Sequence, residues 1–310
     1  MRDTCMWGPI LCHVLLGLTV LYGKVNSVVE KTALDLQKDL EQNKYVLVLF
    51  VNGNKEDTQR AVAEFEQIQT PDLYDQEVLK VTCNDQTLAT SLGIKASPQL
   101  VFYRSKIPAL YDGDLTAPAI QIWVEQAREI NLQSLDDSSF EHLTQASTGA
   151  TTGDWLVIFY KDSCRDYLPA IEGTGVLVRQ KMNVAQVNVD DSPETAKRFN
   201  IKNCPETYLF HHGKMYSYIS DKPDVYRVKS LVSFVTSWYK NVEGRKVPVI
   251  PTAFDKLTES IADYLKEKLQ NPKGSNFLLI GGAVMAVVAF VLAVVVATCS
   301  RNAKKHGKEE

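Results

Sequence analysis

The strongest constraint on the fold of this chain is a pattern of strands and helices that occurs twice, at a spacing of roughly 110 residues. In each copy an apolar strand carries a phenylalanine at or next to its end, Phe50 or Phe159. A proline opens a later apolar strand, 48 residues on at Pro98 and 46 residues on at Pro205. Apolar strands that alternate with helices are typical of a sheet covered on both faces. The sequence therefore predicts two α/β units, each with the order β-α-β-α-β-β-α.

The two copies share their central strands, the helices between them and the strand that the proline opens. The first copy is predicted to hold strands over 45–50, 78–83 and 99–103, with helices over 29–41, 57–68, 88–92 and 117–127. The second is predicted to hold strands over 132–135, 155–160, 184–189, 206–210 and 214–218, with helices over 139–146, 194–199 and 228–239 and one more helix after 160.

Both ends of the chain carry signals of targeting. The apolar run 9–22 follows Arg2 and precedes the small residues Gly23 and Ser27, which predicts a secretory signal peptide. The alternative, a second membrane helix, is disfavoured because the run is short. The segment 277–299 contains no charged residue and predicts a transmembrane helix. The basic residues after it predict a type I topology, with the amino-terminal bulk in the lumen.

Between the second copy and this segment, apolar residues recur at helical spacing from Phe254 to Leu269 and predict an amphipathic helix. It has three possible roles: packing on the second copy, lying on a membrane surface, or pairing with a second chain. The predicted organisation is a signal peptide (1–27), a first domain (28–130), a second domain (131–243), a juxtamembrane helix and linker (244–275), a transmembrane helix (276–299) and a cytosolic tail (300–310).

Charge and cysteine content exclude several classes of protein. The net charge of -3, with acids and bases interleaved, argues against a nucleic-acid partner. Of the six cysteines, the predicted targeting segments contain three. The remaining three, Cys83, Cys164 and Cys204, are too few for a disulfide-dense scaffold. No cofactor and no metal site is predicted.

From about residue 28 to residue 243, the pattern resembles the thioredoxin and protein disulfide isomerase superfamily. That family places a cis-proline at the mouth of its fourth strand, where Pro98 and Pro205 stand in this chain. Two ordinary turn prolines in register are the alternative. The resemblance implies two tandem thioredoxin-like domains, followed here by the amphipathic helix and the transmembrane helix.

The residues that catalyse disulfide exchange in that family are incomplete in both domains. Catalytic members carry a Cys-x-x-Cys pair after the strand that ends in Phe. Those two positions are held by Lys55 and Thr58 in the first domain and by Cys164 and Tyr167 in the second. The resemblance also implies a buried proton-handling glutamate, and here Leu49 and Ile158 replace it. A conventional isomerase or reductase is therefore not predicted.

The resemblance brings Cys204, just before Pro205, close to Cys164 at the tip of a helix. We expect a non-catalytic disulfide or a switchable thiol pair. Cys164 is predicted to lie at a helix N-terminus beside Arg165, which favours a thiolate, whereas Asp162 and Asp166 oppose it. A relic thiol without function is the alternative. Cys83, at the place that we assign to Val189 in the repeat, is predicted to be a buried core thiol.

By analogy with the non-catalytic domains of the family, the predicted function is a chaperone or adaptor for lumenal proteins or unfolded polypeptides. The predicted location is the endoplasmic reticulum membrane, with the cell surface as the alternative. One rival function is an oxidoreductase that uses Cys164 and Cys204, and another is a structural subunit or cell-surface interaction protein. Small residues along the span allow a homodimer. The predicted binding residues are Ser97, Pro98, Tyr103, Tyr167 and Pro205.

Overall fold

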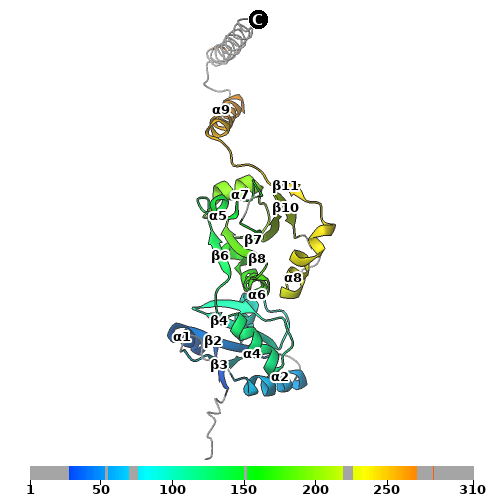
Figure 1. Cartoon of the computed structure of the whole chain (residues 1–310). Coiled ribbons are helices and arrows are strands. Elements are labelled where there is room, and N and C mark those ends of the chain that lie inside the picture. The colour runs from blue at the N-terminus through cyan, green and yellow to red at the C-terminus, as the bar shows by residue number, and fades with distance from the viewer. Residues whose placement is uncertain are drawn as a thin grey trace, which may run out of the picture. The chain divides into compact units, whose positions relative to one another are not determined.

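The computed structural model describes residues 28–52, 55–69, 76–149, 152–218, 226–270 and 282. The chain divides into two compact units, which meet between Pro248 and Val249. The first unit contains two α/β sheets that follow one another along the chain (Figure 1). We call the parts built on them the first and the second domain.

The first sheet has the strand order β1-β3-β2-β4-β5. Strands β1, β3 and β2 are parallel, β4 runs antiparallel to β2, and β5 runs antiparallel to β4. The elements of this domain are β1 (Val29–Lys31), α1 (Ala33–Gln42), β2 (Tyr45–Phe50), α2 (Lys55–Gln67), β3 (Leu79–Cys83), α3 (Gln86–Ser91), β4 (Gln99–Arg104), β5 (Ile107–Leu110) and α4 (Ala117–Gln126).

The second sheet has the order β11-β10-β9-β7-β8-β6, with β6, β8 and β7 parallel. Its elements follow the order of those in the first domain, with two 3₁₀ helices and a short last strand added. They are β6 (Leu132–Leu135), α5 (Phe140–Thr144), β7 (Asp154–Tyr160), the 3₁₀ helix η1 (Asp162–Tyr167), α6 (Leu168–Val178), β8 (Met182–Asn188), α7 (Pro193–Phe199), β9 (Glu206–His211), β10 (Lys214–Ser217), α8 (Val228–Thr236), η2 (Trp238–Asn241) and β11 (Arg245–Lys246).

The two predicted α/β sheets are thus confirmed, with one difference at the start. The sequence predicts a helix from residue 29, but Val29–Lys31 forms a short edge strand that pairs with β3. The helix begins only after Thr32, whose hydroxyl accepts a hydrogen bond from the Asp35 N–H at 3.2 Å. A threonine in this N-cap position satisfies a helix N–H group that would otherwise lack a partner.

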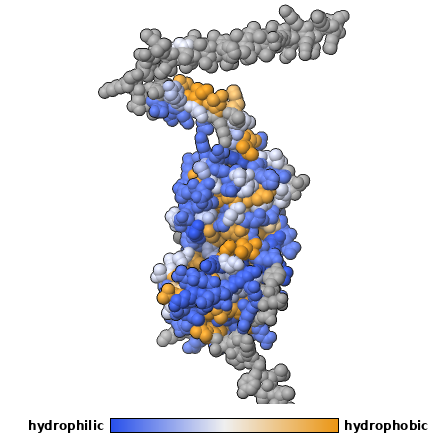
Figure 2. All heavy atoms as spheres, turned by 90° about the vertical axis from the view of Figure 1, so that its left-hand side faces the viewer, coloured by the Kyte–Doolittle hydropathy of each residue, from blue (hydrophilic) through white to orange (hydrophobic). Residues whose placement is uncertain are grey.

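The predicted transmembrane helix is not supported, and the fold class is corrected accordingly. Within the described ranges, every helix is too short or too polar to cross a bilayer. The last long one, α9 (Ala253–Gln270), confirms the predicted amphipathic helix and carries exposed charged residues such as Asp255 and Glu259. Figure 2 shows apolar residues gathered along one side of it. The segments predicted as signal peptide (1–27), membrane span (276–299) and tail (300–310) lie outside the described residues, except for Gly282.

One hydrophobic cluster is shared by the two domains. It contains Leu36 of α1 and Val48 of β2 from the first domain, and Ile171 of α6 and Leu231 of α8 from the second. A second cluster lies under α2 and α4 of the first domain and also takes in Val176 of α6, and a third lies under α5 and α7 of the second domain. The two domains therefore share part of their core.

Helix α6 makes this shared core possible because it is buried along almost its whole length. Its Gly173 lies against β5, where a Cβ atom would come within 2.2 Å of the Leu110 carbonyl oxygen. Its Gly175 lies against Asn131 at the start of the second domain. Two residues without side chains therefore let one helix approach both domains closely.

A buried ion pair crosses the same boundary. The Arg104 guanidinium, at the end of β4, donates to the carboxylate of Glu172 on α6, and their side chains are 1% and 0% exposed. The carboxylate also accepts the backbone N–H groups of Leu132 at 2.6 Å and Asn131 at 3.1 Å. One buried carboxylate thus ties together β4, α6 and the start of β6.

Replacing Glu172 by glutamine is expected to destabilise the chain by about 3–5 kcal/mol, because it leaves the Arg104 charge buried and uncompensated. The double variant Arg104→Met/Glu172→Gln removes that charge and keeps an acceptor for the two backbone N–H groups, so it should recover most of the loss. Urea unfolding of the purified chain measures both. Equal stabilities for the single and the double variant would contradict this role.

Candidate functional site

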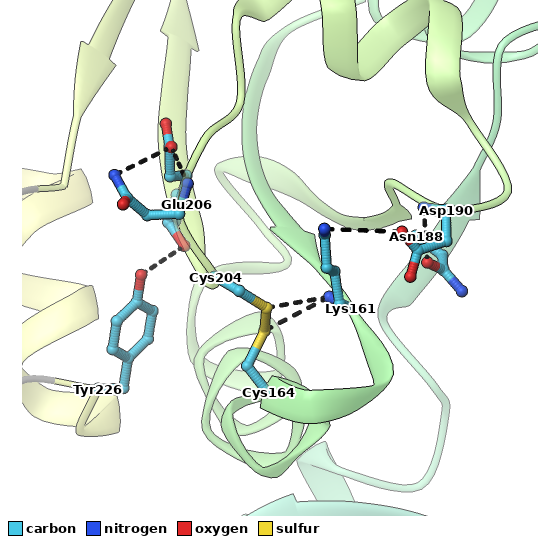
Figure 3. The surroundings of a disulfide bond; sticks show 9 residues. Lys161, Cys164, Asn188, Asp190, Cys204, Glu206 and Tyr226 are labelled. Atoms are coloured by element: carbon cyan, nitrogen blue, oxygen red, sulfur yellow. Dashed lines mark hydrogen bonds and ion pairs between the residues drawn. A yellow bond between two sulfur atoms is a disulfide. The ribbon is translucent and has the colours of Figure 1, made fainter.

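The structure joins Cys164 and Cys204 in a disulfide, with their Cα atoms 6.0 Å apart. Cys164 lies on η1, directly after the central strand β7, and Cys204 precedes Pro205 at the mouth of β9 (Figure 3). The Cys204–Pro205 peptide bond is cis, as is the Ser97–Pro98 bond of the first domain. The pairing of the sulfurs and both cis-prolines confirm what the resemblance implied.

One backbone group faces both sulfur atoms. The Lys161 N–H lies 3.4 Å from Sγ of Cys164 and 3.1 Å from Sγ of Cys204 (Figure 3). The Lys161 ammonium points elsewhere and pairs with Asp190 at 3.8 Å. After reduction of the disulfide, this N–H group would still be available to a thiolate at either sulfur.

The surroundings of Cys164 differ from the predicted position at a helix N-terminus beside Arg165. Helix α6 begins only at Leu168, and Cys164 has the non-helical dihedral angles φ -130° and ψ 31°. The Arg165 guanidinium pairs with Asp162 at 3.2 Å and lies over the Tyr160 ring. The Arg165 cation is therefore engaged away from the sulfur, and the N–H group that reaches Sγ of Cys164 belongs to Lys161, the N-cap residue of η1.

The two sulfurs also differ in their exposure. Cys164 is 4% exposed, whereas Cys204 is half-buried. Tyr167, at the position of the second active-site cysteine, packs its ring against that of Tyr226 with 4.7 Å between centroids. A reagent from solvent therefore reaches Cys204 more easily than Cys164.

Glu206 holds the loop that presents Cys204, a role not found from the sequence. Its carboxylate accepts the backbone N–H groups of Lys202 and Asn203, both at 2.8 Å, and the Tyr208 hydroxyl at 2.6 Å. Burial acts to raise the pKa of Glu206, but these hydrogen bonds outweigh it and lower the pKa below its usual value. An acidic residue directly after the proline is the signal that sequence analysis missed.

The first domain repeats this arrangement without sulfur. The Asn52 N–H donates to the Ser97 hydroxyl, just as the Lys161 N–H faces Cys204. The tip position opposite Ser97 belongs to Lys55, the first residue of α2. This domain consequently has no covalent link between the tip of its helix and its proline loop.

Beside Pro98 lies a groove of about 550 Å³. Its walls are α2 on one side and the loop between β5 and α4 on the other, and its lining residues are Asp57, Arg60, Ala61, Glu64, Pro98, Gly113, Asp114, Leu115 and Thr116. Three of these residues are acidic and one is basic. Arg60 lies 3.8 Å from Asp57, and Glu64 accepts the N–H of Ala117 at 2.9 Å. The groove is open and bears a net negative charge.

The structure also bears on the predictions for Cys83 and Tyr103. Cys83 is a fully buried free thiol, as predicted, but strand register matches it with Val187 rather than Val189, since Phe50 pairs with Cys83 and Phe159 with Val187. Tyr103 is only 4% exposed and lies in the shared core, so it is removed from the predicted binding surface.

Comparison with known proteins places this site in its family. The thioredoxin family model matches residues 131–237. A thioredoxin domain-containing protein of Theileria parva is 34% identical over 159 residues, which cover 50% of this chain and 71% of that protein. A thioredoxin of Rhodospirillum rubrum is 25% identical over 84 residues, covering 27% of this chain and 80% of that protein. The chain belongs to the thioredoxin family.

Solved structures give weaker likenesses. Human ERp44 in its zinc-bound form is 13% identical with a TM-score of 0.31, over 68% of this chain and 57% of that one. ERdj5 (form I) is 15% identical with a TM-score of 0.34, over 70% of this chain and 30% of that one. The chain thus spans little more than half of ERp44 and under a third of ERdj5, and the family assignment does not depend on either.

Replacing Cys204 by serine should destabilise the chain by about 4 kcal/mol, because the disulfide closes a loop of 40 residues. The Cys164→Ser variant should lose the same amount, and the double variant no more than either. Urea unfolding with and without dithiothreitol measures this. The disulfide is not structural if the reductant leaves the stability of the wild-type chain unchanged.

Proposed function

We propose that this chain is a lumenal, protein disulfide isomerase-like protein that binds extended polypeptide without turning over disulfides. The observation that carries the proposal is the contrast between the two proline loops. In the first domain the loop borders an open groove with no thiol, and in the second the corresponding positions are joined covalently. The binding site would accordingly be the groove beside Pro98.

The chemistry of the groove supports a polypeptide segment as its occupant. Its lining combines apolar surface from Ala61, Pro98 and Leu115 with the carboxylates of Asp57, Glu64 and Asp114. Such a lining suits an extended segment that carries both apolar and basic side chains. Client proteins that display such segments before they fold are the proposed partners.

The lumen of the secretory pathway, and the endoplasmic reticulum in particular, is the proposed location. The predicted signal peptide over 1–27 directs the chain there. The Cys164–Cys204 disulfide supports the same compartment, since structural disulfides persist where the environment is oxidising and are rare in the cytosol.

A second candidate is a thiol–disulfide oxidoreductase, favoured by the half-buried Cys204 and the N–H donor 3.1 Å from its sulfur. A client thiolate would attack Sγ of Cys204, breaking the bond to Cys164 and releasing its thiolate. A second client thiol would then displace Cys204, leaving an oxidised client and two protein thiols. Few groups around Cys164 would stabilise its thiolate, so we rank this candidate below the polypeptide-binding function.

The groove is tested with a fluorescein-labelled peptide of alternating leucine, lysine and serine, which lacks cysteine. Reversing two charges, Asp57→Lys with Asp114→Lys, should weaken binding about tenfold, or 1.4 kcal/mol, as expected for a few exposed charge pairs. Added salt should weaken wild-type binding in the same direction. Glu41→Lys with Glu243→Lys, two exposed reversals at residues that do not line the groove, is the matched control and should leave the Kd unchanged. Equal affinities for the groove variant and the control would rule out this binding site.

The second candidate is tested separately by oxidation of a dithiol peptide, with oxidised glutathione as terminal oxidant. We expect the wild-type chain to give no more turnover than the Cys164→Ser and Cys204→Ser variants. Turnover that both substitutions abolish would establish the oxidoreductase instead.

A further inference from the structure

We infer that the Cys164–Cys204 disulfide of the second domain regulates the polypeptide groove of the first domain. The link is the segment 93–98, which contacts the second domain at one end and borders the groove at the other. This inference rests on the proposed function, because it concerns the regulation of the same groove.

The first contact in this path is between backbones. Gly93 has a positive φ of 71°, and a Cβ atom there would lie 2.5 Å from the carbonyl oxygen of Asp166. Asp166 lies on η1, two residues after Cys164. The disulfide therefore fixes a turn whose backbone lies directly against the first domain.

Side chains extend the contact beyond Gly93. A cavity of about 130 Å³ is lined by Ile94, Lys95 and Ala96 of the first domain and by Asp166 and Tyr167 of the second. The Lys95 charge attracts the Asp166 carboxylate across this boundary. The contact is thus partly polar and encloses some free volume, which leaves room for η1 to move.

The same segment ends in the proline loop of the first domain. The Ser97 hydroxyl accepts the Asn52 N–H, which fixes the loop to the end of β2. The next residue, Pro98, lines the groove. Only four residues therefore lie between the contact at Gly93 and the wall of the groove at Pro98.

Reduction supplies the second state of this path. A dithiol of another protein, or dithiothreitol in the test, transfers two electrons and two protons to the Cys164–Cys204 bond and becomes a disulfide itself. The two cysteines are then thiols, and η1 has lost its covalent link to the loop before Pro205. The support of segment 93–98 becomes looser, the groove is less preorganised, and its affinity for peptide falls.

The test measures the Kd of the cysteine-free fluorescent peptide for the full chain, oxidised and after reduction by dithiothreitol, at a temperature where circular dichroism shows both forms folded. We expect the Kd to rise about fivefold or more after reduction, since coupled sites usually change each other's affinity by at least this factor. The Cys164→Ser/Cys204→Ser variant should bind like the reduced chain and ignore the reductant. Hydrogen exchange over 93–98 should rise in both.

Two glycine variants distinguish regulation through segment 93–98 from a general loosening of the structure after reduction. Gly93→Ala places a methyl group against the Asp166 carbonyl and so disrupts the contact between segment 93–98 and η1. The disulfide of this variant still forms, but its Kd for the peptide should no longer change on reduction. Gly213→Ala is the matched control, since Gly213 has the same φ of 71° but its Cβ would meet nothing within 3.7 Å. This control should keep the fivefold response.

The outcomes distinguish the two proposals. If the peptide binds, and binding is lost on charge reversal in the groove, but oxidised and reduced chains bind equally, the regulation is refuted and the proposed function stands. If neither form binds the peptide, the proposed function fails. A response to reduction that persists in Gly93→Ala refutes the path through segment 93–98.

Discussion

The carboxylate of Glu172 is the point on which the arrangement of the two domains depends. It lies on α6 of the second domain, is fully buried, and accepts hydrogen bonds from the Arg104 guanidinium of the first domain and from two backbone N–H groups at the start of β6. A charge buried in this way is tolerated only with several partners in good geometry. Because those partners come from both domains, their relative placement is part of what makes burial possible.

The two domains share one backbone arrangement at the proline loop but differ in the side chain that it holds. In each, the N–H group two residues beyond the phenylalanine of the central strand faces the side chain before the cis-proline. That side chain is a serine in the first domain, which leaves the loop beside an open groove. It is a cysteine in the second, and the disulfide to Cys164 joins the loop to the turn after β7. The first domain thus has a serine hydroxyl, Ser97, where the second has the Cys204 sulfur bonded to Cys164. Only in the second domain is the proline loop held covalently.

Much of this fold was accessible from sequence because its determinants are local. Continuous apolar runs predicted the central strands, and the resemblance to the thioredoxin family implied that Cys204 lies beside Cys164. The short strand β1 was missed because three residues show no period, and it is defined only by its pairing with β3. The start of α6 was misplaced because the resemblance puts Cys164 at the tip of the helix, whereas its backbone is non-helical and a 3₁₀ helix comes first.

Contacts between the domains were beyond sequence reasoning. Nothing local in Arg104 or Glu172 indicates that the two charges meet, and Tyr103 looks like an exposed strand residue until the shared core buries it. The groove beside Pro98 likewise depends on the loop 113–116, which lies far from α2 in the chain. Such features arise from packing at long range, which single-sequence patterns do not encode.

Helix α6 has a consequence for how this protein can change over evolutionary time. Thioredoxin folds are commonly viewed as interchangeable modules, but here one helix contributes Ile171 to the shared core and Gly173 to the contact with β5. A second domain exchanged for a paralogue would need both glycines and the buried acid at matching positions. Substitutions in one domain at this shared core therefore require compatible residues in the other, so the two domains evolve as one unit.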